Sequence, residues 1–143
     1  MKKVVLCIIA FVILSCSSDD ENLPIVPIDA ISFNLNGIAY FLTEYSVMLN
    51  PADTNVRMIE ATFDNNTKTL LFFVIVEETN QIEEFMLIEN GIEYSSDPIS
   101  GDRETSIITH TDTKMEGTFR VTMNDRNDVP IYVFTNGIIN IKF

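Results

Sequence analysis

The chain has 143 residues, with 9 Lys and Arg against 21 Asp and Glu, so its formal net charge at pH 7 is −12. This length fits one domain of ordinary size. The negative charge argues against a nucleic-acid partner, because the phosphate backbone would be repelled. Hydrophobic residues make up 46% of the chain, which excludes a disordered polyelectrolyte. The one long apolar run is at the extreme N-terminus, which excludes a protein with several membrane spans.

The N-terminus is typical of an export signal. Two lysines precede an uncharged apolar run over residues 4–14, and Ser15 and Cys16 follow it. A basic start, a short apolar segment and a small residue before a cleavage point define a secretory signal peptide. As a helix, the run would extend about 16 Å, roughly half of a bilayer core, so it is too short for a permanent span. We therefore expect a cleaved signal helix over residues 1–15.

The segment Ile13-Leu14-Ser15-Cys16 resembles the lipobox of bacterial lipoproteins, although Leu14 replaces the smaller residue that is commonest there. The resemblance implies cleavage before Cys16, a diacylated sulfur and an acylated amino group. Palmitate-type chains then hold the protein on a membrane without a spanning helix. The alternative is an ordinary secretory signal with Cys16 as a chance thiol. Lipidation is favoured, because Cys7 leaves with the signal and a lone thiol is unusual in an exported protein.

Two hydroxyl and three carboxylate side chains directly follow the cysteine: Ser17, Ser18, Asp19, Asp20 and Glu21. This acidic stretch resembles the lipoprotein export signal of Bacteroidota, which implies transport to the outer face of the outer membrane. The alternative is a solvated acidic spacer. Further along, Pro24 and Pro27 disfavour a helix and stiffen the chain. We therefore assign residues 16–30 to the lipidated cysteine and its tether, and residues 31–143 to the folded domain.

Three Asn-Gly pairs predict hairpin turns: Asn36-Gly37, Asn90-Gly91 and Asn136-Gly137. A tight hairpin turn needs positive φ at both central residues, and Asn followed by Gly meets this requirement best. Folding the flanking residues across each pair gives one apolar face, such as Phe134 with Ile139 and Ile141 around the third pair. We therefore expect three β-hairpins.

The remaining segments also favour strands. Residues 117–123 alternate between polar and apolar, which indicates a half-buried strand. The continuous apolar run over residues 69–76 suits a central strand, and residues 56–63 form the strand before it. Residues 105–111 are rich in β-branched side chains, and residues 97–103 form the expected long loop. With no helical stripe or cap, the mature chain is expected to be an all-β, antiparallel β-sandwich or small barrel of about 8–9 strands built from Asn-Gly hairpins.

Residue types that carry catalysis are sparse in the expected domain. His110 is the only histidine, no cysteine follows Cys16, and no Gly-x-Ser-x-Gly turn occurs, so we assign no catalytic residue and no cofactor. In a strand, His110 would share a face with Ile108 and Asp112. We interpret it as a partly exposed strand residue, the alternative being a pH-responsive or metal-contacting one.

A weak calcium candidate is the segment with Asp125, Asn127 and Asp128, because calcium prefers oxygen ligands. The segment lacks the spacing of an EF-hand loop, and Arg126 lies at its centre. A solvated turn between two strands is the alternative that we favour, so no metal is assigned.

Two further segments add to the resemblance suggested by the N-terminus: Phe33-Asn34-Leu35-Asn36-Gly37, and Glu116-Gly117-Thr118-Phe119 before the last Asn-Gly pair. Together with the acidic stretch after Cys16, they give the chain a resemblance to small outer-membrane lipoproteins of the Bacteroidota, of the flavobacterial type. This group has no assigned function. The resemblance implies a lipid anchor in the outer membrane and a domain that faces the cell exterior, and it supplies no catalytic residues.

The leading hypothesis is a non-enzymatic, lipid-anchored surface module. Its expected partners are the membrane, through the lipid anchor, and a protein or glycan ligand, with no nucleic acid. The first alternative is a structural or assembly subunit of an outer-membrane complex. The second is a small hydrolase, which would need two carboxylates facing each other across a cleft, or His110 beside an Asp and a Ser.

Overall fold

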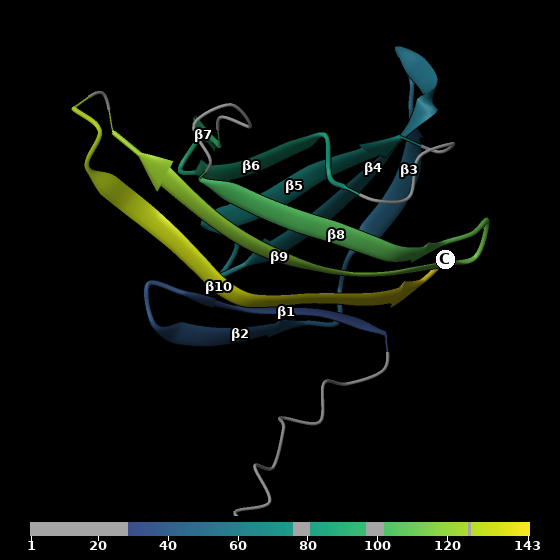
Figure 1. Cartoon of the computed structure of the whole chain (residues 1–143), viewed down its shortest axis with the longest axis horizontal. Coiled ribbons are helices and arrows are strands. Elements are labelled where there is room, and N and C mark those ends of the chain that lie inside the picture. Colours follow the sequence, from purple (N-terminus) through teal and green to yellow (C-terminus); the bar gives the residue numbers. More distant parts are fainter. Residues whose placement is uncertain (1–28, 76–80, 97–101, 126) are drawn as a thin grey trace, which may run out of the picture.

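The computed structural model describes residues 29–75, 81–96, 102–125 and 127–143, which contain ten strands and no helix (Figure 1). Within them, accordingly, no helix long and apolar enough to cross a membrane is found. The strands are β1 (Ala30–Leu35), β2 (Ile38–Leu42), β3 (Ser46–Asn50), β4 (Asp53–Phe63), β5 (Lys68–Ile75), β6 (Glu84–Glu89), β7 (Ile92–Ser95), β8 (Arg103–His110), β9 (Lys114–Asn124) and β10 (Pro130–Lys142).

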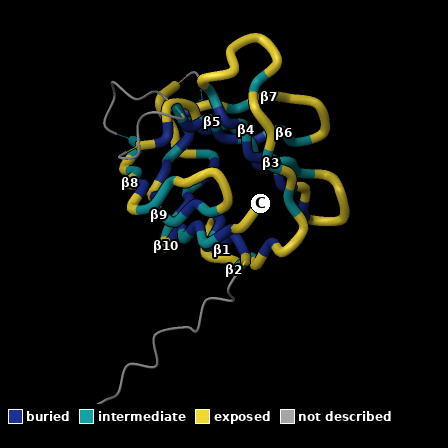
Figure 2. The backbone as a smooth tube through the Cα atoms, turned by 90° about the vertical axis from the view of Figure 1, so that its right-hand side faces the viewer, coloured by how far each residue is buried: buried dark blue, intermediate teal, exposed yellow. Residues whose placement is uncertain are grey.

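The strands form two antiparallel five-stranded sheets, which pack face to face. The first sheet has the order β2-β1-β10-β9-β8, and the second has the order β3-β4-β5-β6-β7. Buried residues line the side on which each sheet faces the other (Figure 2). Phenylalanines from both sheets meet there, and the ring of Phe85 lies 5.0 Å from Phe119 and 5.1 Å from Phe134. The expected all-β, antiparallel fold is confirmed, as an open sandwich rather than a closed barrel.

Two of the three predicted Asn-Gly hairpins are confirmed. Asn36 and Gly37 have φ values of 50° and 83° between β1 and β2, and Asn90 and Gly91 have 51° and 80° between β6 and β7. A tight turn also joins β4 to β5, since all three residues of 64–66 have positive φ. Residues 69–75 of the run lie in β5, the central strand of the second sheet, as predicted, and residue 76 lies outside the described residues.

The hairpin predicted at Asn136-Gly137 is wrong, because β10 continues through it. The pairing of β10 with β9 moves from Phe134 opposite Val121 to Gly137 opposite Phe119, three residues against two. The extra residue makes a β-bulge, in which Asn136 has a φ of 53°. The bulge also shifts the side-chain alternation by one residue. Phe134 before it therefore faces the core together with Ile139 and Ile141 after it, and this gave the sequence the apolar face expected of a hairpin.

Two smaller differences concern the start of the domain and its edge. β3 was not predicted; it is a short edge strand with three consecutive apolar residues, Val47, Met48 and Leu49, so it lacks the alternation that indicates a half-buried strand. The domain also includes Ala30, which is fully buried, and Asp29, whose carboxylate accepts hydrogen bonds from the Tyr45 hydroxyl and, at 2.9 Å, from the Lys142 N–H. The signal, the lipobox and the acidic stretch lie outside the described residues, as does most of the 97–103 loop.

Candidate functional site

Arg57 and His110 connect the two sheets inside the sandwich. Arg57 of β4 is only 8% exposed, and its Nη1 lies 3.1 Å from His110 Nε2 in β8. The same nitrogen donates to the carbonyl oxygen of Thr111 at 2.8 Å, and the guanidinium stands 4.4 Å from the ring centre of Phe143. Burial lowers the pKa of Arg57 below its usual value. The histidine is therefore part of a contact that holds the sheets together.

The face predicted for His110 is wrong. A bulge interrupts the pairing of β8 with β9 between Ile107 and Thr109. Beyond it, His110 lies opposite the buried Met115, whereas Ile108 is 73% exposed. Since directly paired residues share one side of a sheet, His110 points inward and Ile108 outward.

The three weak calcium candidates close the turn between β9 and β10. Asp125 Oδ1 accepts hydrogen bonds from the backbone N–H groups of Val129 and Asn127, at 2.9 and 2.8 Å, and these bonds lower the pKa of Asp125. Asp128 accepts a hydrogen bond from the Asn124 amide at 2.8 Å. The carboxylates of Asp125 and Asp128 therefore accept hydrogen bonds from groups of the turn itself. In the part of the chain that the structure describes, no group of three or more His, Cys, Asp or Glu side chains is arranged to hold a metal ion.

A second polar contact between the sheets joins β5, β6 and β10. Lys68 forms ion pairs with Asp64 and, at 3.0 Å, with Glu89, and Glu89 also accepts a hydrogen bond from the Tyr132 hydroxyl. The hydrogen bond from Tyr132, followed by that from Lys68, lowers the pKa of Glu89. Burial, followed by the bond to Glu89, raises the pKa of Tyr132. The ionised carboxylate is therefore the form that the folded state stabilises.

We predict that Glu89→Gln lowers the free energy of unfolding at pH 7 by about 1 kcal/mol, because a charge-assisted hydrogen bond and an ion pair are weakened at a partly exposed site. A carboxyl group with a lowered pKa stabilises the fold above its unfolded pKa and stops doing so as the pH falls through its folded pKa. In urea titrations from pH 7 downward, the wild type should therefore lose more stability below about pH 4.5 than the variant. Glu93→Gln, at an exposed position on β7, is the control; a variant curve parallel to the wild type would contradict this account.

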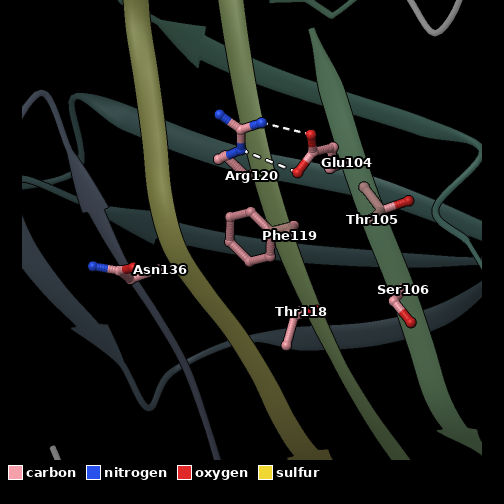
Figure 3. Close-up of a pocket in the computed structure, with 7 residues that line it drawn as sticks. All are labelled: Glu104, Thr105, Ser106, Thr118, Phe119, Arg120 and Asn136. Carbon is pink, nitrogen blue, oxygen red and sulfur yellow. Dashed lines mark hydrogen bonds and ion pairs between the residues drawn. The ribbon is translucent and has the colours of Figure 1, made fainter. Parts of the chain in front are cut away.

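A shallow hollow of about 300 Å³ lies on the outer side of the first sheet, over β8, β9 and β10 (Figure 3). Across it, Arg120 donates two hydrogen bonds to the carboxylate of Glu104, at 3.1 and 2.5 Å, so the two charges compensate each other. The other exposed groups at its rim are the hydroxyls of Ser106 and Thr118 and the amide of Asn136. The only histidine of the chain points to the other side of this sheet, so it cannot activate these hydroxyls.

The hollow is the polar end of a row that crosses all five strands of the first sheet. The pairing places five residues side by side in this row: Phe41, Ser32, Ile138, Thr118 and Ser106. Phe41, on the edge strand β2, is 54% exposed. Ser32, which is buried, and Ile138 separate this ring from the exposed hydroxyls of Thr118 and Ser106, so the row does not bring them together.

The outer side of the second sheet is very different, because it is apolar. We call it the methionine face and define it by six outward residues of β3 to β6: Met48, Met58, Leu71, Phe73, Ile75 and Met86. Met48 is paired with Met58, Met58 with Phe73, and Leu71 with Met86, so the side chains are direct neighbours. Met48 is 42% exposed, and the other five are half-buried.

The charged groups on this outer side are all negative in the described strands of the second sheet. Glu60, Glu84 and Glu93 point outward around the apolar residues. The two cations of these strands are used elsewhere: Arg57 lies between the sheets, and Lys68 pairs with Asp64 and Glu89. The methionine face is therefore an apolar surface with a carboxylate rim.

Sequence reasoning did not identify this face, although a signal for it is present. In the run over residues 69–76, the odd-numbered residues 71, 73 and 75 are as apolar as the even-numbered ones that fill the core. A strand with one side in water usually alternates, so an unbroken apolar run predicts that both sides are covered. No protein-family model, curated protein or solved structure matches this chain.

Proposed function

We propose that this protein is a lipid-anchored module, exposed on the outer surface of the outer membrane, that binds a protein partner without catalysis. The observation that carries the proposal is the methionine face. Apolar area that stays in water forgoes about 25 cal/mol per Å² of burial free energy, and a contiguous apolar patch of this kind is typical of a protein-binding surface. The lipobox and the acidic stretch support the location.

The lipid anchor is tested by metabolic labelling with an alkyne analogue of palmitate. We expect label on the wild type and on Cys7→Ser, whose cysteine leaves with the signal, and complete loss of label from Cys16→Ser. Intact mass should show a chain that begins at residue 16 and carries acyl groups. Equal labelling of the wild type and Cys16→Ser would refute the anchor.

The location is tested by protease treatment of intact cells. The wild-type domain should be removed, and a variant with Asp19, Asp20 and Glu21 replaced by alanine should be protected, because it would remain on the inner side of the membrane. Alanine exchanges at Asn22 and Leu23, directly after this stretch, are the matched control. If the alanine variant is digested as fast as the wild type, the export interpretation of the carboxylates is wrong.

The alternative is a structural or assembly subunit of an outer-membrane complex, and the same face favours it, since permanent interfaces are more apolar than transient ones. The two are distinguished by purification in mild detergent. A partner present at equal stoichiometry with the wild type, and absent with Leu71→Thr, indicates a subunit. Retention of a peptide or glycan, without a stoichiometric protein, favours a module that captures a ligand.

A further inference from the structure

We infer that the methionine face binds a cationic amphipathic segment of another protein, with apolar side chains along one side and Lys or Arg beside them. The inference rests on the proposed function and specifies its partner.

The apolar block consists of cross-strand pairs that adjoin one another on β3 to β6. Met58 and Phe73 form one cross-strand pair, and Leu71 and Met86 form the next pair along the strands. Met48 continues the first pair onto the edge strand β3. Methionine side chains are flexible and polarizable, so they adapt to apolar partners of different shape. A groove or face of this composition suits the apolar side of an amphipathic segment.

The rim determines the charge of the partner. Glu84 and Glu93 are exposed, Glu60 is half-buried, and these strands place no cation on the same side. Lys or Arg side chains that flank an apolar stripe would meet these carboxylates, which adds attraction and favours the correct orientation. The net charge of −12 further favours the approach of a basic segment and disfavours an acidic one.

The same charges argue against the other occupants. A second copy placed on this face would bring Glu60, Glu84 and Glu93 of both chains together, which is unfavourable for like charges. A bilayer that contains anionic lipid would repel the carboxylate rim for the same reason. A basic protein segment has neither problem.

The test uses the full-length protein in nanodiscs of zwitterionic phosphatidylcholine, with empty nanodiscs as the blank. The probe is a fluorescent helical peptide of leucine and lysine with its leucines on one side, and binding is measured by anisotropy. A peptide of the same composition in scrambled order removes the apolar side, and a leucine–glutamate peptide reverses the charge. We expect saturable binding of the first peptide, at least about tenfold weaker binding of both controls, and weakening with added salt.

Two sets of variants locate the binding. Leu71→Thr with Phe73→Thr should weaken binding by about tenfold or more, and the triple exchange of Glu60, Glu84 and Glu93 to Gln should weaken it and reduce its salt dependence. The glutamine exchanges are at the rim and leave the core unchanged, so they remain informative even if the threonine variant unfolds. Phe41→Thr, on the outer side of the first sheet, is the matched control and should bind as the wild type does.

Several results would overturn the inference. These are the absence of saturable binding, equal binding of the scrambled or acidic peptide, and an affinity unchanged by both sets of variants. A dimer in sedimentation velocity that Leu71→Thr disperses would assign the face to a second copy. Binding of peptide-free anionic vesicles that is lost in the same variant would assign it to a membrane. None of these results would affect the labelling and protease tests, so a failure here is distinct from a failure of the proposed anchor and location.

Discussion

Replacing Phe85 with alanine is expected to lower the free energy of unfolding by about 4 kcal/mol, because a fully buried ring would leave a cavity that the sheets cannot close. Phe85 belongs to the second sheet, and its ring lies within 5.1 Å of Phe119 and Phe134 of the first sheet and 6.2 Å from Phe72 beside it. The variant therefore removes contacts within one sheet and across the sandwich at once. Urea unfolding followed by far-ultraviolet circular dichroism measures the loss.

The size of the loss in the free energy of unfolding distinguishes an effect of core packing from a general effect of losing apolar area. Phe85→Leu keeps most of the volume and should cost about 1 kcal/mol. Phe41→Ala removes the same ring from an exposed position on β2 and should change stability by less than about 0.5 kcal/mol. A small effect of Phe85→Ala would show that the sheets do not depend on this cluster. The chain has only two cysteines, at positions 7 and 16, so no disulfide within the domain compensates for the cavity.

The parts of the fold that could be predicted are those determined by local chemistry. The backbone at Asn36-Gly37 and at Asn90-Gly91 has positive φ at two successive residues. Asn followed by Gly adopts this conformation at little steric cost. Each of these turns also fixes the register of its hairpin, so the inward faces of β1, β2 and β6 follow directly. Hairpins are local, and local signals were sufficient for them.

The parts that could not be predicted depend on neighbouring strands. Asn136 has the positive φ of a turn residue, yet the strand continues, because β1 and β9 both pair with β10 on either side of the bulge. The Asn36 side chain contributes to this, since it accepts a hydrogen bond from Val133 N–H and donates to Ile131 O of β10. The orientation of His110 depends in the same way on its bulge opposite β9. The sequence of one strand does not show which strands pair with it, and this pairing determines whether the strand continues and which side its residues face.

The candidate site was harder to predict than the fold. Polar residues that carry chemistry are the visible candidates in the sequence, but in the structure Asp125, Asn127 and Asp128 close a turn and His110 contacts Arg57. The methionine face consists of residues that any core also uses. The unbroken apolar run of β5 indicates that both of its sides are covered, but the assignment of β4, β5 and β6 to one sheet is what places Met58 and Met86 beside Leu71 on the side away from the core.

Replacing Gly137 with alanine is expected to lower the free energy of unfolding by about 3 kcal/mol, because the bulge of β10 has no room for a side chain. A Cβ atom at Gly137 would lie 2.5 Å from two ring carbons of Phe119 and 2.5 Å from the carbonyl oxygen of the same residue. The ring is buried and the carbonyl belongs to β9, so neither can move without disturbing the pairing of the two strands. Thermal unfolding by circular dichroism measures the loss.

Gly37→Ala is the matched control, since it tests backbone conformation without crowding. Gly37 has a φ of 83° and no atom within 4 Å of the added Cβ, so alanine there should cost only about 1–2 kcal/mol through its disfavoured backbone. In the double variant Phe119→Leu with Gly137→Ala, the smaller side chain should relieve the contact with the ring but not the contact with the carbonyl. The double variant should therefore lose less stability than the sum of the two single variants, but part of the loss caused by Gly137→Ala should remain. Equal losses from Gly37→Ala and Gly137→Ala, with no coupling to Phe119, would mean that contact with Phe119 is not what excludes a side chain at Gly137.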